Sequence, residues 1–112
     1  MNCEKAFVTF GEERVEKDFE LLKKGKFEDK KLYRFIEHAI VDLKKDPASG
    51  VKLAKSIWPK DYTEKYNLTN LWKYDLPNSW RLIYTIKKDE TMILCVILEW
   101  FDHKGYERRF KY

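Results

Sequence analysis

The chain has 112 residues, which fits a single domain over residues 1–112. Its 44% hydrophobic and 16% aromatic residues exclude an intrinsically disordered protein. No apolar run approaches the roughly 20 residues that cross a bilayer, and MNCEKAFVTF is no signal peptide, so we expect a cytoplasmic protein that makes no membrane contact. Two cysteines give neither a disulfide framework nor metal-ligand spacing, and we expect neither a metal nor another cofactor.

The net charge of +4 is confined to one half of the chain. Residues 1–50 carry 11 basic and 11 acidic side chains, whereas residues 51–112 carry 12 basic and 8 acidic ones. A basic excess concentrated in this way favours a polyanionic partner. The alternative is the solvated face of a lysine-rich protein.

The first half predicts a strand followed by a helical hairpin. Residues 6–10 form the strand, and a first amphipathic helix runs from Glu12 or Glu13 to Gly25. A second helix, from about Glu28 to Leu43, shows the clearest apolar stripe in the chain. Because the link between the helices is short, we expect them to lie antiparallel.

The middle of the chain is harder to assign. Asp46-Pro47 resembles a helix N-cap followed by proline, and it predicts a weak third helix that ends at Trp58-Pro59. Gly50 argues against that helix. Residues 58–69 show little periodicity and are expected to form a connecting loop.

Three antiparallel strands are predicted next, over residues 71–76, 79–87 and 92–103, joined by turns at residues 77–79 and 88–90. Alternation gives each strand an apolar face that suits covering by the helices. The other face carries five polar or charged side chains: Lys73, Asp75, Arg81, Glu99 and His103. We therefore expect an α+β two-layer domain with a charged outer sheet face and a short C-terminal tail.

The charged residues suit RNA cleavage by internal attack, because there the neighbouring 2′-hydroxyl is the nucleophile. The protein then supplies only a base, a cation for the phosphate and an acid. Arg81 suits the phosphate, Glu99 or His103 suits acid–base chemistry, and Tyr106 suits base stacking or proton donation. Lys73 and Lys104 add positive charge.

Each of these residues also has a structural interpretation. Arg81 can pair with Asp75 or Glu99, and Glu99 can be a structural glutamate with a partner. His103 can be a surface residue without a role. Arg108 and Arg109 can belong to a solvated tail.

The segments Trp80-Arg81-Leu82-Ile83-Tyr84 and His103-Lys104-Gly105-Tyr106 resemble the RelE/ParE family of type II toxins, as does the order of elements. The family's second hairpin strand carries an arginine–aliphatic–aliphatic–tyrosine signature, and a His/Arg-x-x-Tyr segment follows its final strand. The resemblance implies a RelE-like fold and a ribosome-dependent endoribonuclease that cuts mRNA in the ribosomal A site. It also implies a cognate antitoxin, which we expect to be acidic and partly disordered.

Carried over by position, Arg81 matches the phosphate-binding arginine and Tyr106 the terminal aromatic residue. Lys73 matches a basic residue on the preceding strand, and His103 or Lys104 matches the basic position after the last strand. Glu99 has no counterpart in the family, so its catalytic role is our own inference.

We therefore assign Arg81, His103, Tyr106 and Glu99 to catalysis. The RNA-binding residues are assigned as Lys73, Lys104, Arg108 and Arg109. ParE-like members of the family inhibit DNA gyrase without cutting nucleic acid, which gives a second hypothesis. A third hypothesis is an inactive relative that only binds an antitoxin. Arg81, His103 and Tyr106 favour the nuclease.

Overall fold

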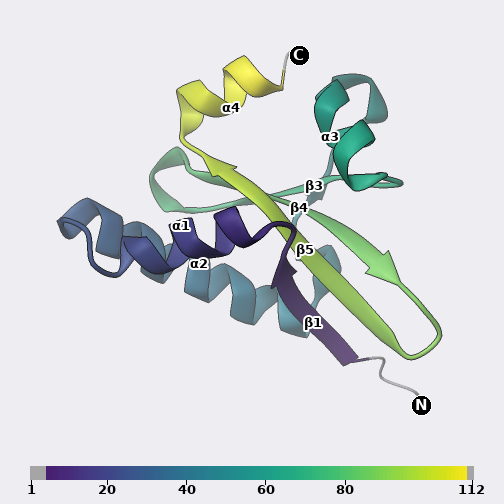
Figure 1. Cartoon of the computed structure of the whole chain (residues 1–112), viewed down its shortest axis with the longest axis horizontal. Coiled ribbons are helices and arrows are strands. Elements are labelled where there is room, and N and C mark those ends of the chain that lie inside the picture. Colours follow the sequence, from purple (N-terminus) through teal and green to yellow (C-terminus); the bar gives the residue numbers. More distant parts are fainter. Residues whose placement is uncertain (1–4, 111–112) are drawn as a thin grey trace.

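The computed structural model describes residues 5–110, so Cys3 and the rest of the MNCE segment lie outside the described range. Figure 1 shows its helices and strands. They follow in the order β1 (Lys5–Phe10), α1 (Glu13–Leu22), α2 (Phe27–Lys45), β2 (Val51–Lys52), α3 (Lys60–Tyr66), β3 (Trp72–Asp75), β4 (Arg81–Lys88), β5 (Met92–Phe101) and α4 (His103–Arg109).

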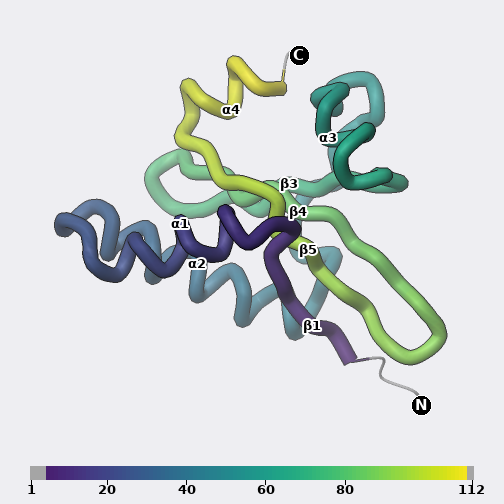
Figure 2. The backbone as a smooth tube through the Cα atoms, viewed as in Figure 1, coloured from purple at the N-terminus to yellow at the C-terminus, as the bar shows by residue number. Residues whose placement is uncertain are grey.

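The sheet has the strand order β1-β5-β4-β3-β2. The β1 strand runs parallel to β5, and the other neighbours are antiparallel. In the tube of Figure 2, the β4–β5 hairpin is the long green pair of segments that runs from the centre to a turn at the lower right. Its register places Arg81 opposite Phe101 and Ile83 opposite Glu99, and an irregularity at Ile83/Tyr84 then places Tyr84 opposite Ile97.

One sheet face is covered by the α1–α2 hairpin. The apolar stripes of both helices meet the inward side chains of β3, β4 and β5 there. This first core consists of Val15, Phe19, Leu32, Ile36, Ala39, Leu43, Leu76, Leu82, Tyr84, Cys95 and Ile97. The α+β class and the helical hairpin that the sequence predicts are confirmed.

The opposite sheet face, called the far face below, is also covered in part. There α3 and α4 pack over the sheet, away from the α1–α2 hairpin (Figure 1). This second core consists of Leu53, Tyr62, Leu68, Leu71, Ile83, Val96, Leu98, Tyr106 and Phe110. The expectation of helices on one side only is therefore wrong, because the far face is apolar enough to bury two further helices.

The predicted third helix is absent from residues 47–57. Asp46 does cap a turn, since its side chain accepts a hydrogen bond from the Ala48 amide at 3.0 Å. The segment contains two short 3₁₀ turns instead of an α-helix, at Pro47–Ser49 and Lys55–Ile57. Between these turns the chain pairs with the sheet, with Val51 opposite Lys73. Gly50 permits this path because it packs directly against the neighbouring strand.

The expected loop at residues 58–69 contains α3, which the sequence analysis did not predict. Tyr62 and Tyr66 are four residues apart and therefore share a helix face. The expected C-terminal tail is also wrong, because residues 103–109 form α4. The Asp102 side chain caps α4 by accepting a hydrogen bond from the Gly105 amide at 2.7 Å, and the helix buries Tyr106.

Within residues 5–110, every helix is too short or too polar to span a membrane.

Replacing Gly50 with alanine should lower the free energy of unfolding by about 1–3 kcal/mol. A methyl group at this position would lie 2.5 Å from the Lys73 carbonyl oxygen and 2.6 Å from the Tyr84 hydroxyl, so the backbone must shift. Urea unfolding measures the change. The neighbouring exposed substitution Ser49→Ala is the control and should stay within about 0.5 kcal/mol of wild type. Equal stability of the two variants would contradict this packing.

Candidate functional site

Arg81 begins β4 on the far face and is mostly buried, with 20% of its side chain exposed. Its Nη1 donates a hydrogen bond to the Ser79 carbonyl at 2.7 Å. Its Nε is buried and has no hydrogen-bond partner within the described residues, because the nearest carboxylate oxygen, Asp75 Oδ1, is 3.6 Å away. A buried donor of this kind is costly, and an acceptor from outside reaches it only if the side chain or its neighbours move.

Asp75 is shared between two cations. Lys73 Nζ donates to both of its carboxylate oxygens, at 2.9 and 3.1 Å, while Arg81 Nε lies 3.6 Å from Oδ1. The Asp75 side chain is 56% exposed, whereas that of Lys73 is 16% exposed. One carboxylate therefore faces two cations, and the cluster of Lys73, Asp75 and Arg81 keeps a formal charge of +1 at the surface. The pairing of Arg81 with Asp75 that the sequence allows is present.

Tyr106 fixes the Arg81 side chain from above. The guanidinium carbon lies 5.2 Å from the centre of the Tyr106 ring, and that ring stacks on Phe110 with a centroid distance of 4.7 Å. Tyr106 is only 3% exposed, so its ring is not open for stacking on a nucleobase in this conformation. The residue instead holds the guanidinium in place.

The start and outer face of α4 carry exposed basic residues. His103 pairs with Glu107 one turn along the helix, while Lys104 and Arg108 are exposed. His103 comes two residues after Phe101, the cross-strand partner of Arg81, so α4 begins beside the Arg81 cluster. The structure thus gathers Lys73, Arg81, His103, Lys104 and Tyr106 at one end of the sheet.

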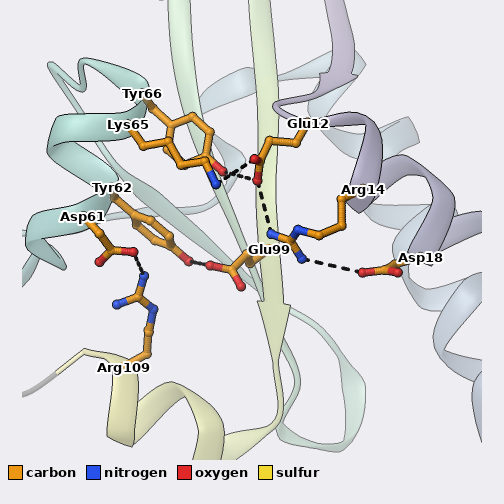
Figure 3. A network of polar contacts seen from close by, with 9 residues as sticks. All are labelled: Glu12, Arg14, Asp18, Asp61, Tyr62, Lys65, Tyr66, Glu99 and Arg109. Atoms are coloured by element: carbon orange, nitrogen blue, oxygen red, sulfur yellow. Dashed lines mark hydrogen bonds and ion pairs between the residues drawn. The ribbon is translucent and has the colours of Figure 1, made fainter.

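Glu99 and Arg109 belong to a different set of contacts, drawn in Figure 3. The Tyr62 hydroxyl donates to Glu99, and Arg109 donates to Asp61 while its guanidinium lies 4.6 Å from the Tyr62 ring centre. Burial, together with Glu99, raises the pKa of the Tyr62 hydroxyl far above its ordinary value. The Arg109 guanidinium holds the pKa of Asp61 below its ordinary value. Both predicted site residues therefore attach α3 to the rest of the domain.

Glu12 attaches the other side of α3 to the start of α1. Its carboxylate lies 2.6 Å from Lys65 Nζ, accepts a hydrogen bond from the Tyr66 hydroxyl at 2.9 Å, and pairs with Arg14 at 3.2 Å. Lys65 and Tyr66 hold the pKa of Glu12 below its ordinary value. Figure 3 shows α3 spanning these contacts between α1 and α4.

The sequence does not predict the polar contacts of α3 described above, although its residue spacing contains a weak helical signal. Asp61 and Lys65 are four residues apart, as are Tyr62 and Tyr66, which is the spacing of helix neighbours. A helix of 7 residues gives too few repeats for that pattern to be distinctive.

Glu99 also lines a hollow of about 300 Å³ between α1 and β5, together with Arg14, Asp18 and Trp100. This places it beside α1 and α3 as well as on the sheet. In the part of the chain that the structure describes, no group of three or more His, Cys, Asp or Glu side chains is arranged to hold a metal ion.

Comparison with protein-family models, curated proteins and solved structures finds no match for this chain.

Acid should weaken the attachment of α3. A carboxylate whose pKa is depressed in the folded state stabilises the fold above its unfolded pKa, and this stabilisation is lost as the pH falls through the folded value. For Glu12 and Asp61 that loss starts near their ordinary pKa values of 4.5 and 3.8 and continues below them. The measurement is urea unfolding of wild type and Glu12→Gln between about pH 6 and pH 3.

The Glu12→Gln variant should show a shallower loss of stability over this range than wild type. Glu13→Gln is the control, because Glu13 has only an exposed pairing with Lys17. If Glu12→Gln and wild type lost stability in parallel, the contacts of Glu12 would have no part in holding the fold.

Proposed function

We propose that this chain is the toxin of a type II toxin–antitoxin system and acts as a ribosome-dependent mRNA endoribonuclease. The observation that carries the proposal is the Arg81 cluster, in which a guanidinium whose Nε has no hydrogen-bond partner among residues 5–110 lies beside the basic start of α4. The 2′-hydroxyl of the RNA attacks the adjacent phosphate, so the 5′-oxygen leaves and a 2′,3′-cyclic phosphate forms. The protein therefore needs no nucleophile of its own.

The Arg81 cluster supplies the charge that this reaction requires. Arg81 and Lys73 share a single exposed carboxylate, so an RNA phosphate at the rim of the cluster meets one uncompensated positive charge. A phosphate oxygen can form a charge-assisted hydrogen bond with the exposed part of the Arg81 side chain, whereas the buried Nε becomes reachable only if that side chain moves. Tyr106 keeps the guanidinium in one orientation, which limits the entropy lost on binding.

His103 is the better candidate for proton transfer. Its side chain is exposed at the start of α4 although it pairs with Glu107, whereas Glu99 is partly buried and accepts a hydrogen bond from Tyr62. A histidine changes charge near neutral pH and can serve as base for the 2′-hydroxyl or as acid for the leaving oxygen. Lys104 and Arg108, which are both exposed, extend the positive surface along the RNA backbone.

The partners follow from the same proposal. They are mRNA in the ribosomal A site, reached in the cytoplasm, and an acidic, partly disordered antitoxin. Exposed apolar side chains next to basic ones suit such an antitoxin. They are Phe7, Leu21, Phe27, Val41, Val51 and Met92.

One observation favours a second candidate, a ParE-like inhibitor of DNA gyrase. Tyr106 is buried and Glu99 is already engaged, which leaves fewer groups free for chemistry than the sequence suggests. A protein that inhibits by binding needs no catalytic acid or base. The covering of the far face by α3 and α4 would therefore not prevent such inhibition.

Substituting Arg81 with alanine should reduce cleavage of mRNA on programmed ribosomes by about 10²–10³-fold, the usual cost of removing one donor to a developing negative charge. Transcript ends are mapped after incubation with wild type and variant. The control is Arg34→Ala, which removes an exposed arginine from α2. Wild-type cleavage by a folded Arg81→Ala variant would contradict the proposal. Accumulation of linear DNA without cleaved transcripts would support the gyrase alternative.

Replacing His103 with glutamine should lower cleavage by about 10²–10⁴-fold, the range for general acid–base groups. His38→Gln is a matched control, because His38 is likewise exposed on a helix and likewise faces a carboxylate four residues on, Asp42 at 3.6 Å. An equal loss in both variants would remove His103 from the mechanism.

A further inference from the structure

The segment between β2 and α3 forms a second basic surface that the site above does not include. Residues 51–60 read VKLAKSIWPK and contain three lysines and no acidic residue. Lys52, Lys55 and Lys60 are all exposed, and within residues 5–110 none of the three takes part in an ion pair or a side-chain hydrogen bond. We call Lys52, Lys55, Trp58 and Lys60 the Trp58 surface.

The indole of Trp58 is held in a fixed orientation at the centre of this surface. Its Nε1 donates a hydrogen bond to the Leu53 carbonyl at 3.0 Å, and Pro59 follows it directly before α3 begins. The residue is only partly buried. An aromatic ring that is both partly exposed and pre-oriented loses little entropy when a planar ligand stacks on it.

Two hollows flank the indole. One, of about 330 Å³, is lined by Lys55, Lys60 and the first turns of α3. The other, of about 440 Å³, is lined by Lys52, Lys55 and Thr69. Trp58 lines both of them, so planar groups in the two hollows would each contact its side chain.

The charge around the hollows is positive. Glu64 is the acidic residue among the side chains that line them, and the nearby Asp61 is already paired with Arg109. Three cations against one free carboxylate leave a formal excess of +2, which suits a polyanion.

We infer that the Trp58 surface binds single-stranded RNA, with bases stacked at Trp58 and phosphates paired with Lys52, Lys55 and Lys60. Aromatic stacking interleaved with basic side chains is how single strands are bound without sequence preference. The choice of RNA over DNA rests on the proposed nuclease function. An acidic peptide could pair with the lysines, but its carboxylates would gain nothing from stacking on the indole that lines both hollows.

The Trp58 surface is connected to the Arg81 cluster through β2. In the β2–β3 pairing, Val51 lies opposite Lys73, so the basic segment starts beside the strand that carries Lys73 and Asp75. A strand of RNA that leaves the cluster can therefore continue along β2 to Trp58. The surface would hold the transcript on one side of the cleaved bond.

The test is binding of a fluorescein-labelled oligouridine of about ten nucleotides, within the usual footprint of single-strand binders. Its 2′-positions are O-methylated so that internal attack is impossible. Fluorescence anisotropy is measured over a series of salt concentrations, without ribosomes. The variants are Trp58→Leu, Trp58→Phe and the double substitution Lys55→Gln with Lys60→Gln. The matched control, Lys24→Gln with Lys30→Gln, removes the same charge from exposed positions near the α1–α2 link.

Trp58→Leu should weaken binding at least about fivefold, whereas Trp58→Phe should retain most of the affinity because it still stacks. The Lys55/Lys60 variant should reduce the slope of log affinity against log salt by about 1.4, and the Lys24/Lys30 control should leave it unchanged. An abasic oligonucleotide of the same length should be insensitive to Trp58→Leu.

Wild-type binding by both Trp58→Leu and the Lys55/Lys60 variant would overturn the inference, as would an equal loss in the Lys24/Lys30 control. Tighter binding of an oligoglutamate peptide than of RNA, with the same dependence on Trp58, would identify an acidic protein segment as the ligand and also overturn it. This experiment measures binding and not cleavage. A negative result would therefore reject RNA binding at the Trp58 surface without bearing on the nuclease proposal, which the Arg81→Ala cleavage experiment tests. Conversely, loss of cleavage in Arg81→Ala says nothing about Trp58.

Discussion

The pairing of β4 with β5 is the constraint on which the rest of the structure depends. It places Arg81 opposite Phe101 and Glu99 opposite Ile83, so a cation and a carboxylate point to the far face of an otherwise apolar ladder. Neither charge can be left in an apolar layer without a partner. Asp75 and Tyr106 accommodate Arg81, and Tyr62 accommodates Glu99. The helices α3 and α4 are thus placed partly by the charges beneath them.

This arrangement divides the predicted site residues into two groups with different roles. Lys73, Arg81, His103 and Lys104 gather where the sheet meets the start of α4, and their positive charge is only partly neutralised. Glu99 and Arg109 instead hold α3, through Tyr62 and Asp61. A charged residue on the far face is therefore not by itself evidence of chemistry. What distinguishes Arg81 is a buried Nε without a hydrogen-bond partner in the described range.

Periodicity predicted the parts of the fold that consist of long elements. The α2 stripe and the three strands from Trp72 onward follow from it, as does the position of Arg81 on the sheet face opposite the α1–α2 hairpin. It failed for short elements: α3 has 7 residues and β2 has 2, and both are stabilised by tertiary contacts rather than by local preference. For the same reason the sequence showed Tyr106 as an aromatic residue free to stack on RNA. Tyr106 is buried against Phe110 because residues 103–109 form α4. The sequence of these residues does not predict that helix.

Arg81 is proposed to bind an RNA phosphate, and NMR of its side chain can detect that contact. The Nε–Hε resonance of Arg81 is followed while a short 2′-O-methylated RNA is added to saturation. A large shift of this resonance is expected, because a bound phosphate places negative charge beside the guanidinium. A saturated complex in which the Arg81 resonance is unchanged, while resonances elsewhere shift, would contradict the account.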